Sequence, residues 1–243
     1  MTSTIVKSVG RVFDVLELFQ HQREPLKASK ISLAVGVPKS STSALLKSMV
    51  QLGYLSYDHK AHKYFPTMRV HGLGEWLPTL LLGEETSRML HDLHERTSET
   101  VGLAVRNGLR MEFISVLPGK FPISLSIMNG FLVPILGTAV GTAYMTTLSE
   151  TQLIELFKNT ESIEPDVAAR VSLQEIRSEI ELAKKVGYAA SYDRFIQDSG
   201  AIAWALPEKI TTHPQVMAVG GSSPRIRRSE EALLKIILSL LPK

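Results

Sequence analysis

Two lysines and two serines recur at helical spacing between residues 38 and 52. If this segment is a helix, Lys39, Ser40, Ser43 and Lys47 share one side of it with Gln51, and no acidic residue accompanies them. Short hydroxyl side chains can hydrogen-bond the edges of bases, and lysine ammonium groups can contact phosphates. The pattern predicts a helix that enters a DNA major groove, although a plain helical hairpin with a solvated face would carry the same residues.

The elements that must position this face are two helices within residues 28–52. Gly36 allows a tight turn between them because glycine readily adopts positive φ, and Pro38 suits the first position of the second helix. A preceding helix is expected from Ser8, acting as its cap, to His21. The apolar faces expected to pack together are Val9, Val12, Phe13, Leu16 and Phe19; then Ile31, Ala34 and Val35; then Leu45, Met49 and Leu52, flanked by Leu46 and Val50.

A hairpin is expected directly after these helices. Aromatic-rich runs at 54–57 and 62–65 surround the polar turn 58–61. The polar and basic residues near its tip are Lys60, His62 and Lys63. Three helices followed by a basic hairpin predict a winged helix-turn-helix, in which the wing lies over the DNA backbone or minor groove.

The distribution of charge supports a nucleic-acid partner for the N-terminal third. Residues 1–71 hold ten lysines and arginines and four acidic residues, a formal charge of +6, whereas the remainder sums to −3. The 243-residue chain contains no cysteine, which excludes disulfides and thiolate chemistry and suits a reducing compartment. No apolar run approaches the ~20 residues that a membrane helix needs, and no signal peptide is recognised, so we expect a cytoplasmic protein.

Several kinds of catalytic and metal chemistry find no support in the chain. Ser199 lacks a G-x-S-x-G setting, and His91 with His94 would supply only two metal ligands. No phosphate-binding or dinucleotide-binding glycine pattern is present. We therefore predict no catalytic residue, no metal and no cofactor.

Four segments in this order resemble the IclR family of bacterial transcriptional regulators. They are SVGRVFDVLELF at 8–19, GVPKSS at 36–41, LGYL at 52–55 and MRVHGLG at 68–74. The resemblance implies an α+β protein with two domains: a winged helix-turn-helix over 1–66, a linker helix over 67–82, and an effector-binding and oligomerisation domain over 83–243. The last would be a GAF-like or profilin-like domain with an antiparallel sheet.

The resemblance also implies how DNA is bound. Family members often carry an aromatic residue and then an arginine where this chain has Ser43 and Ala44. The expected DNA contacts are therefore Lys39, Ser40, Ser41, Ser43 and Lys47 on the helix and Lys60, His62 and Lys63 on the wing.

In the linker helix, Val70, Leu73, Leu77, Leu80 and Leu81 would form a stripe bordered by Trp76 and interrupted by Pro78. We expect two subunits to share it, giving a homodimer or a tetramer of two dimers, although the stripe could pack against its own chain.

The C-terminal region alternates strand and helix patterns. Strands are expected at 100–105, 111–117, 123–127, 188–192, 201–206 and 216–220, with an Asn107-Gly108 hairpin turn. Helices are expected at 84–98, 137–148, 153–158, 172–185 and 226–241.

Three segments resemble those that frame the family's effector pocket, namely 132–143, 187–203 and 217–222. Ala203 stands where many members have cysteine, and Ala218 and Gly220 stand where binders of small keto acids have serines. The family's acidic residue could correspond to Ser191 or Asp193. The expected pocket residues are Leu125, Met128, Gly137, Thr138, Asp193, Ala203, Ala218 and Gly220. These departures favour a widened apolar pocket over a degenerate one.

The function implied is that of a ligand-responsive regulator. We expect a repressor that binds a palindromic operator as a dimer, with a small organic acid, aromatic acids included, or a related lactone or amide as effector. The alternatives are a DNA-tethered enzyme that acts on a small molecule and a DNA-binding protein without an effector.

Overall fold

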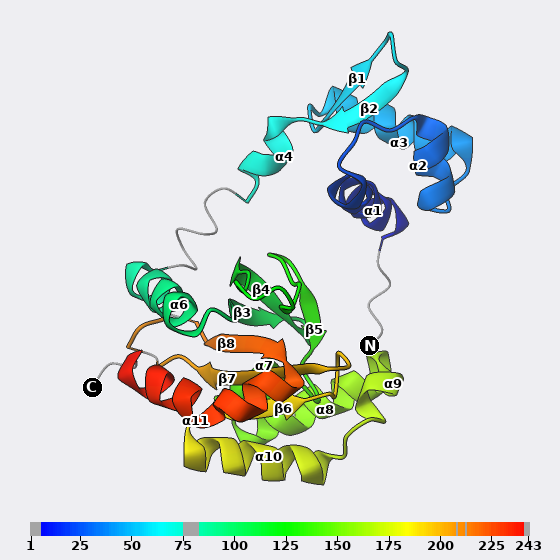
Figure 1. Ribbon diagram of the computed structural model, residues 1–243. Coiled ribbons are helices and arrows are strands. Elements are labelled where there is room, and N and C mark those ends of the chain that lie inside the picture. Colours follow the sequence, from blue (N-terminus) through cyan, green and yellow to red (C-terminus); the bar gives the residue numbers. More distant parts are fainter. Residues whose placement is uncertain (1–5, 75–82, 208, 212, 241–243) are drawn as a thin grey trace. The chain divides into compact units, whose positions relative to one another are not determined.

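The computed structural model describes residues 6–74, 83–207, 209–211 and 213–240, and the chain divides into two compact units, Met1–Leu80 and Leu81–Lys243. Figure 1 shows helices and a hairpin in the first unit, and one large sheet with helices in the second. The predicted α+β organisation with an antiparallel sheet is confirmed. The domain boundaries at 66 and 82 stay predictions.

The N-terminal unit is a winged helix-turn-helix. Its elements are α1 (Lys7–Gln22), α2 (Ala28–Ala34), α3 (Lys39–Gln51), β1 (Leu55–Asp58), β2 (Lys63–Pro66) and α4 (Met68–Gly72). Strands β1 and β2 pair antiparallel from Leu55↔Pro66 to Asp58↔Lys63, so the predicted wing is present. The core that joins the helices to the wing comprises Val15, Phe19, Leu26, Ile31, Leu46, Met49, Leu55 and Tyr64.

Two predicted details of α1 are wrong. The helix begins at Lys7 after Val6, so Ser8 does not cap it. Val15 and Phe19 are its buried residues, whereas Val9 is exposed and Phe13 is 57% exposed. The helix carries apolar residues on more than one side, so the spacing rule could not decide which stripe the core takes.

The second helix of the pair is displaced slightly from its prediction. Pro38 is the residue before α3 and has an extended backbone with ψ 142, so it is not the first helical residue. Thr42, Leu46 and Met49 are the buried residues of α3, whereas Leu52 is exposed. Thr42 can be buried because its hydroxyl lies 3.1 Å from the carbonyl oxygens of both Val37 and Pro38. Met49 was therefore predicted correctly, whereas Thr42 and Leu46, and not Leu45 and Leu52, complete the buried face.

The linker prediction is only partly covered by the described residues. Helix α4 spans Met68–Gly72, and the Thr67 hydroxyl caps it by accepting from the Arg69 amide. Val70 is half-buried and Leu73 is exposed. Trp76, Leu77, Pro78, Leu80 and Leu81 lie outside the described residues.

The C-terminal unit contains one six-stranded antiparallel sheet in the order β5-β4-β3-β8-β7-β6. Its strands are β3 (Thr100–Asn107), β4 (Arg110–Leu117), β5 (Leu132–Pro134), β6 (Ala189–Tyr192), β7 (Ser199–Ala205) and β8 (Gln215–Ser222). Its helices are α6 (Glu84–Thr97), α7 (Ala139–Met145), α8 (Glu150–Ile163), α9 (Pro165–Ala168), α10 (Leu173–Val186) and α11 (Ser223–Leu240).

Each face of this sheet has its own hydrophobic core. On one face, Val101 and Leu103 pack with residues of α6 and α11. On the other face, Ala104 and Ala218 pack with residues of α7, α8 and α10. Because side chains alternate along a strand, the second face also receives Gly102 and Gly220, which places the ends of β3 and β8 beside the cavity described below.

Three sequence predictions in this unit need correction. Residues 123–127 are not a strand, and the edge strand is instead β5, paired with residues 110–112 of β4. The helix expected over 137–148 is only Ala139–Met145. The hairpin is present, but Asn107 pairs with Arg110, so Gly108 and Leu109 form its two-residue turn, with φ 61 at Gly108. The strands expected near 188, 201 and 216 and the terminal helix are confirmed.

Within the described residues, no helix combines the length and hydropathy that crossing a membrane would require.

Candidate nucleic-acid face and ligand cavity

The outer side of α3 presents unpaired cations and hydroxyls. Lys39, Ser40, Ser41 and Lys47 are exposed, and Ser43 is half-buried. Among the described residues, neither lysine has an ion-pair partner, and none of the three serine hydroxyls has a hydrogen-bond partner. No acidic residue occurs in α3. This arrangement leaves both the charges and the hydroxyl donors available to an external polyanion.

The tip of the wing is held by an aspartate turn. The Asp58 carboxylate accepts hydrogen bonds from the amides of Lys60 (2.8 Å) and Ala61 (3.1 Å). These hydrogen bonds, with that from Ala61 the stronger influence, lower the pKa of Asp58. His62 has φ 52, and its ring lies 3.0 Å from the Tyr57 hydroxyl. Of the predicted wing contacts, Lys60 and His62 are exposed and Lys63 is half-buried at the start of β2.

Arg69 is a cation on this unit that we had not predicted to contact DNA. Its guanidinium lies 5.1 Å from the centre of the Tyr54 ring, next to the turn that leaves α3. An arginine stacked on an aromatic ring is held in place while its charge stays in solvent. In the sequence it contributed to the charge balance and to the MRVHGLG segment, but nothing there pairs position 69 with position 54.

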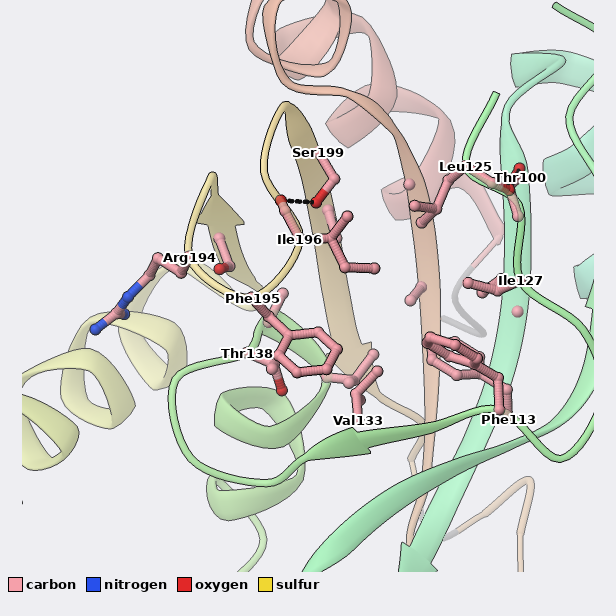
Figure 2. A pocket seen from close by; sticks show the side chains of 18 residues that line it. Thr100, Phe113, Leu125, Ile127, Val133, Thr138, Arg194, Phe195, Ile196 and Ser199 are labelled. Atoms are coloured by element: carbon pink, nitrogen blue, oxygen red, sulfur yellow. Dashed lines mark hydrogen bonds between the residues drawn. The ribbon is translucent and has the colours of Figure 1, made fainter. Parts of the chain in front are cut away.

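A cavity of about 80 Å³ lies in the C-terminal unit on the sheet face that carries α7. Figure 2 shows its side chains converging from strands β3, β4 and β5 and from the loops that precede β5 and β7. Four of the eight residues predicted to line a pocket do line it, namely Leu125, Thr138, Ala218 and Gly220. The structure thus brings together residues that are 95 positions apart in the chain.

The other four predicted pocket residues do not line this cavity. Met128 is 59% exposed, and Gly137 borders a separate hollow. The Asp193 carboxylate is directed to α11, where it accepts a 2.8 Å hydrogen bond from the Ser223 hydroxyl. Ala203 is fully buried in the hydrophobic core. Ser191, the alternative to Asp193, does line the cavity.

Aromatic wall residues of the cavity were missed from the sequence. Phe113, Phe131 and Phe195 all line it. The Phe113 ring lies where a side chain at Gly102 would be, because a Cβ there would be 2.6 Å from Phe113 Cδ1. The alternation of Met111 and Phe113 in β4 was a usable signal for an inward-facing Phe113, whereas the loop positions carried none.

The structure gives no support to metal binding or catalysis among the residues that it describes. No group of three candidate metal ligands occurs there. His91 and His94 instead donate ring N–H groups to the carbonyls of Ser87 (2.8 Å) and Pro118 (2.9 Å). The Ser199 hydroxyl donates to the Ile196 carbonyl at 2.6 Å, so its hydrogen is not shared with a histidine or a carboxylate that could act as a base.

Comparison with known protein families shows which family contains both of these units. Residues 8–59 match the model of the IclR helix-turn-helix domain, and residues 76–240 match the bacterial transcriptional regulator IclR C-terminal domain. The chain belongs to the IclR family. It is therefore a ligand-responsive, DNA-binding transcription regulator with an N-terminal helix-turn-helix and a C-terminal effector-binding domain.

Individual IclR-family relatives are distant but extend over most of the chain. It is 26% identical over 186 residues to the HTH-type transcriptional regulator XynR of Escherichia coli K12, covering 76% of this chain and 74% of XynR. It is 20% identical over 221 residues to the repressor AllR of the same strain, covering 90% and 82%. The crystal structure of Thermotoga maritima IclR superposes with a TM-score of 0.74 at 17% identity, covering 96% and 95%. These relatives are regulators rather than enzymes.

Proposed function

We propose that α3 and the wing bind operator DNA and that the cavity in the C-terminal unit receives the effector. The observation that supports DNA binding is the face of α3 on which the lysines and serine hydroxyls have no partner among the described residues. Lys39 and Lys47 would contact phosphates, and Ser40, Ser41 and Ser43 would approach base edges. Lys60, His62 and Lys63 on the wing would contact the flanking backbone or minor groove.

The regulator is proposed to act as a repressor on a palindromic operator. A single recognition helix reads a short half-site, so two copies would double the site that is read. Val9, Phe13 and Leu73 leave apolar surface exposed on α1 and just after α4, which supports self-association as a homodimer or a tetramer of two dimers. Sedimentation velocity of the full chain checks this, and a monomer at micromolar concentration would contradict it.

The salt dependence of DNA affinity tests the proposed recognition face. The full chain first selects a duplex from a random pool. We then measure its affinity by fluorescence anisotropy from low to high salt. The plot of log K against log[salt] has a negative slope, and each phosphate contact contributes about 0.9 to its steepness. Lys39→Ala combined with Lys47→Ala should therefore make the slope shallower by about 1.8.

A matched control removes the same charge elsewhere. Lys158→Ala with Lys185→Ala takes two exposed lysines from the C-terminal unit. That variant should keep the wild-type slope. An unchanged slope in the α3 variant, or an equal change in both variants, would show that the recognition face is wrongly placed.

A further inference from the structure

The inner surface of the cavity is mainly hydrocarbon. The large apolar side chains that line it include Phe113, Leu125, Ile127, Phe131, Val133 and Phe195. A carboxylate enclosed by such a surface is unstable unless hydrogen-bond donors or a cation replace the water that it loses. The nature of the effector therefore depends on which polar groups of the wall are free to donate.

Two of the wall hydroxyls have already used their single hydrogen. Thr100 Oγ1 donates to the Leu125 carbonyl and Thr138 Oγ1 donates to the Pro134 carbonyl, each at 2.8 Å. Each oxygen also accepts from a backbone amide, at 3.0 Å for Thr100 and 3.1 Å for Thr138. A threonine hydroxyl has one hydrogen and two lone pairs, so these groups can accept from a ligand but cannot donate to one.

The serine hydroxyls of the wall differ from each other. Ser199 Oγ donates to the Ile196 carbonyl at 2.6 Å, a bond drawn in Figure 2. Ser191 lines the same cavity, and its hydroxyl has no hydrogen bond to any residue that the structure describes. Ser191 is therefore the wall hydroxyl with a free donor.

The one cationic residue along the described wall is also engaged. Arg194 is directed away from the cavity in Figure 2 and forms an ion pair with Glu179 of α10. The same carboxylate accepts from the Thr142 hydroxyl at 3.2 Å. An anionic ligand would have to take the guanidinium from Glu179 and turn it inward, which would leave Glu179 without its cation.

The backbone of the sheet offers few alternatives. Gly102, Ala201, Ala218 and Gly220 line the cavity from the paired interior of β3, β7 and β8. In that part of an antiparallel sheet, backbone N–H groups bond to the neighbouring strands. Ala139 and Val140 at the start of α7 also line the cavity, and their backbone amides have no hydrogen bond to any residue that the structure describes. These amides and the Ser191 hydroxyl are uncharged donors, whereas the one cation of the described wall is held by Glu179. The cavity can therefore enclose a neutral ligand more readily than an anion.

We propose that the effector is an uncharged, largely apolar molecule about the size of one ring, with a single polar group that meets Ser191. This inference rests on the proposal that the cavity is the effector site, and it narrows the organic acid expected from the sequence. An apolar cavity of about 150 Å³ accepts benzene. The 80 Å³ cavity would therefore need Phe195, which is 38% exposed on the loop before β7, to move outward.

Matched pairs of ligands test this charge preference. We would measure thermal unfolding and calorimetric binding of the full chain with benzamide against benzoate, and with cyclohexanecarboxamide against cyclohexanecarboxylate. The members of each pair share shape and differ in charge. The amides should raise the unfolding temperature and bind at least tenfold more tightly than the carboxylates.

Variants locate the binding in the cavity. Ser191→Ala should weaken amide binding several-fold, and Ala218→Leu should abolish it by filling the space. Met128→Ala, which alters an exposed residue outside the cavity, should change nothing. If Ala218→Leu fails to fold, Ser191→Ala alone decides the location, and undiminished amide binding by that variant would overturn the proposal.

The two levels of the proposal fail in different ways. Carboxylates that bind as tightly as the amides or more tightly, with the binding lost in Ala218→Leu, would overturn the neutral effector but keep the cavity as the effector site. No shift with any of the four compounds would overturn both. The proposal that α3 and the wing bind DNA is tested separately, by the salt dependence of DNA affinity.

Discussion

The proposed recognition face, which comprises Lys39, Ser40, Ser41, Ser43 and Lys47 of α3, and the cavity use similar side chains in opposite ways. On α3, Ser40, Ser41 and Ser43 keep their hydroxyls free, and Lys39 and Lys47 have no acidic neighbour among the described residues. In the cavity, the hydroxyls of Thr100, Thr138 and Ser199 bond to backbone carbonyls and the arginine bonds to a glutamate, so that Ser191 alone among the wall hydroxyls is free. The availability of donors, rather than the presence of polar residues, thus separates a surface suited to a polyanion from one suited to a neutral ligand.

The largest effect that would sharpen this comparison comes from the buried ion pair beside the cavity. Arg225 Nη2 lies 2.7 Å from Oε2 of Glu99, whose side chain is 4% exposed, and the guanidinium also lies 4.2 Å from the centre of the Phe121 ring. Arg225→Leu should lower the free energy of unfolding by about 3–5 kcal/mol because it leaves a buried carboxylate without its partner. Urea denaturation measures the loss.

The exposed pair of Arg177 and Glu150 supplies the control for that change. Both of its side chains are about half exposed, so Arg177→Leu should cost less than about 1 kcal/mol. Cavity binding should weaken in Arg225→Leu while the exchange protection of α3 stays unchanged. Equal costs for the two variants would contradict the structural importance of the buried pair.

The corresponding change in the N-terminal unit is Leu46→Ala. Leu46 is completely buried beneath the recognition face, so truncation should cost about 2–5 kcal/mol through lost burial and a cavity. Hydrogen exchange of peptides from residues 28–52 measures the local loss. Leu33→Ala, at a position 85% exposed on α2, should stay within about 0.5 kcal/mol. Equal exchange in the two variants would mean that Leu46 does not support α3.

The smallest expected effect concerns the wing, where Asp58 titrates. Its pKa is lowered by the amides of Ala61 and Lys60, so the ionised form favours the folded turn. The resulting stabilisation is present at neutral pH and is lost as the pH falls through the lowered pKa. NMR titration of the two amides should give a midpoint below that of the same aspartate in an unstructured peptide. Asp58→Asn should abolish the titration, and a midpoint at or above the peptide value would contradict the turn.

The two regions also differ in how far the sequence could predict them. The recognition face lies on one helix, so residue spacing alone was enough to place Lys39 and Lys47 together on an exposed side. The cavity is lined by residues from several segments between Thr100 and Gly220, so its walls form only when these segments pack together in the folded chain. Ala218 and Gly220, which do line it, were predicted from the family resemblance alone.

Three of the four predicted residues that do not line the cavity, Met128, Gly137 and Asp193, lie in loops, whereas Ala203 lies in β7 and is buried in the core. Met128 and Asp193 lie in segments with no repeating pattern, so their side-chain directions depend on contacts made later in the chain, such as that of Asp193 with Ser223. Phe195 was missed for the same reason. In α1 the sequence predicted a helix correctly but not its buried side, because more than one apolar stripe was available.

A ligand-responsive regulator requires that binding in the cavity change the affinity for DNA, and one measurement tests this coupling directly. The affinity of the full chain for its selected duplex is measured with and without the tightest-binding amide, for the wild type and for Ala218→Leu. We predict that the amide changes the wild-type dissociation constant at least about fivefold, the lower end of typical allosteric coupling. Ala218→Leu should bind DNA normally and show no change. An unaltered wild-type affinity, or an equal change in the variant, would contradict the account.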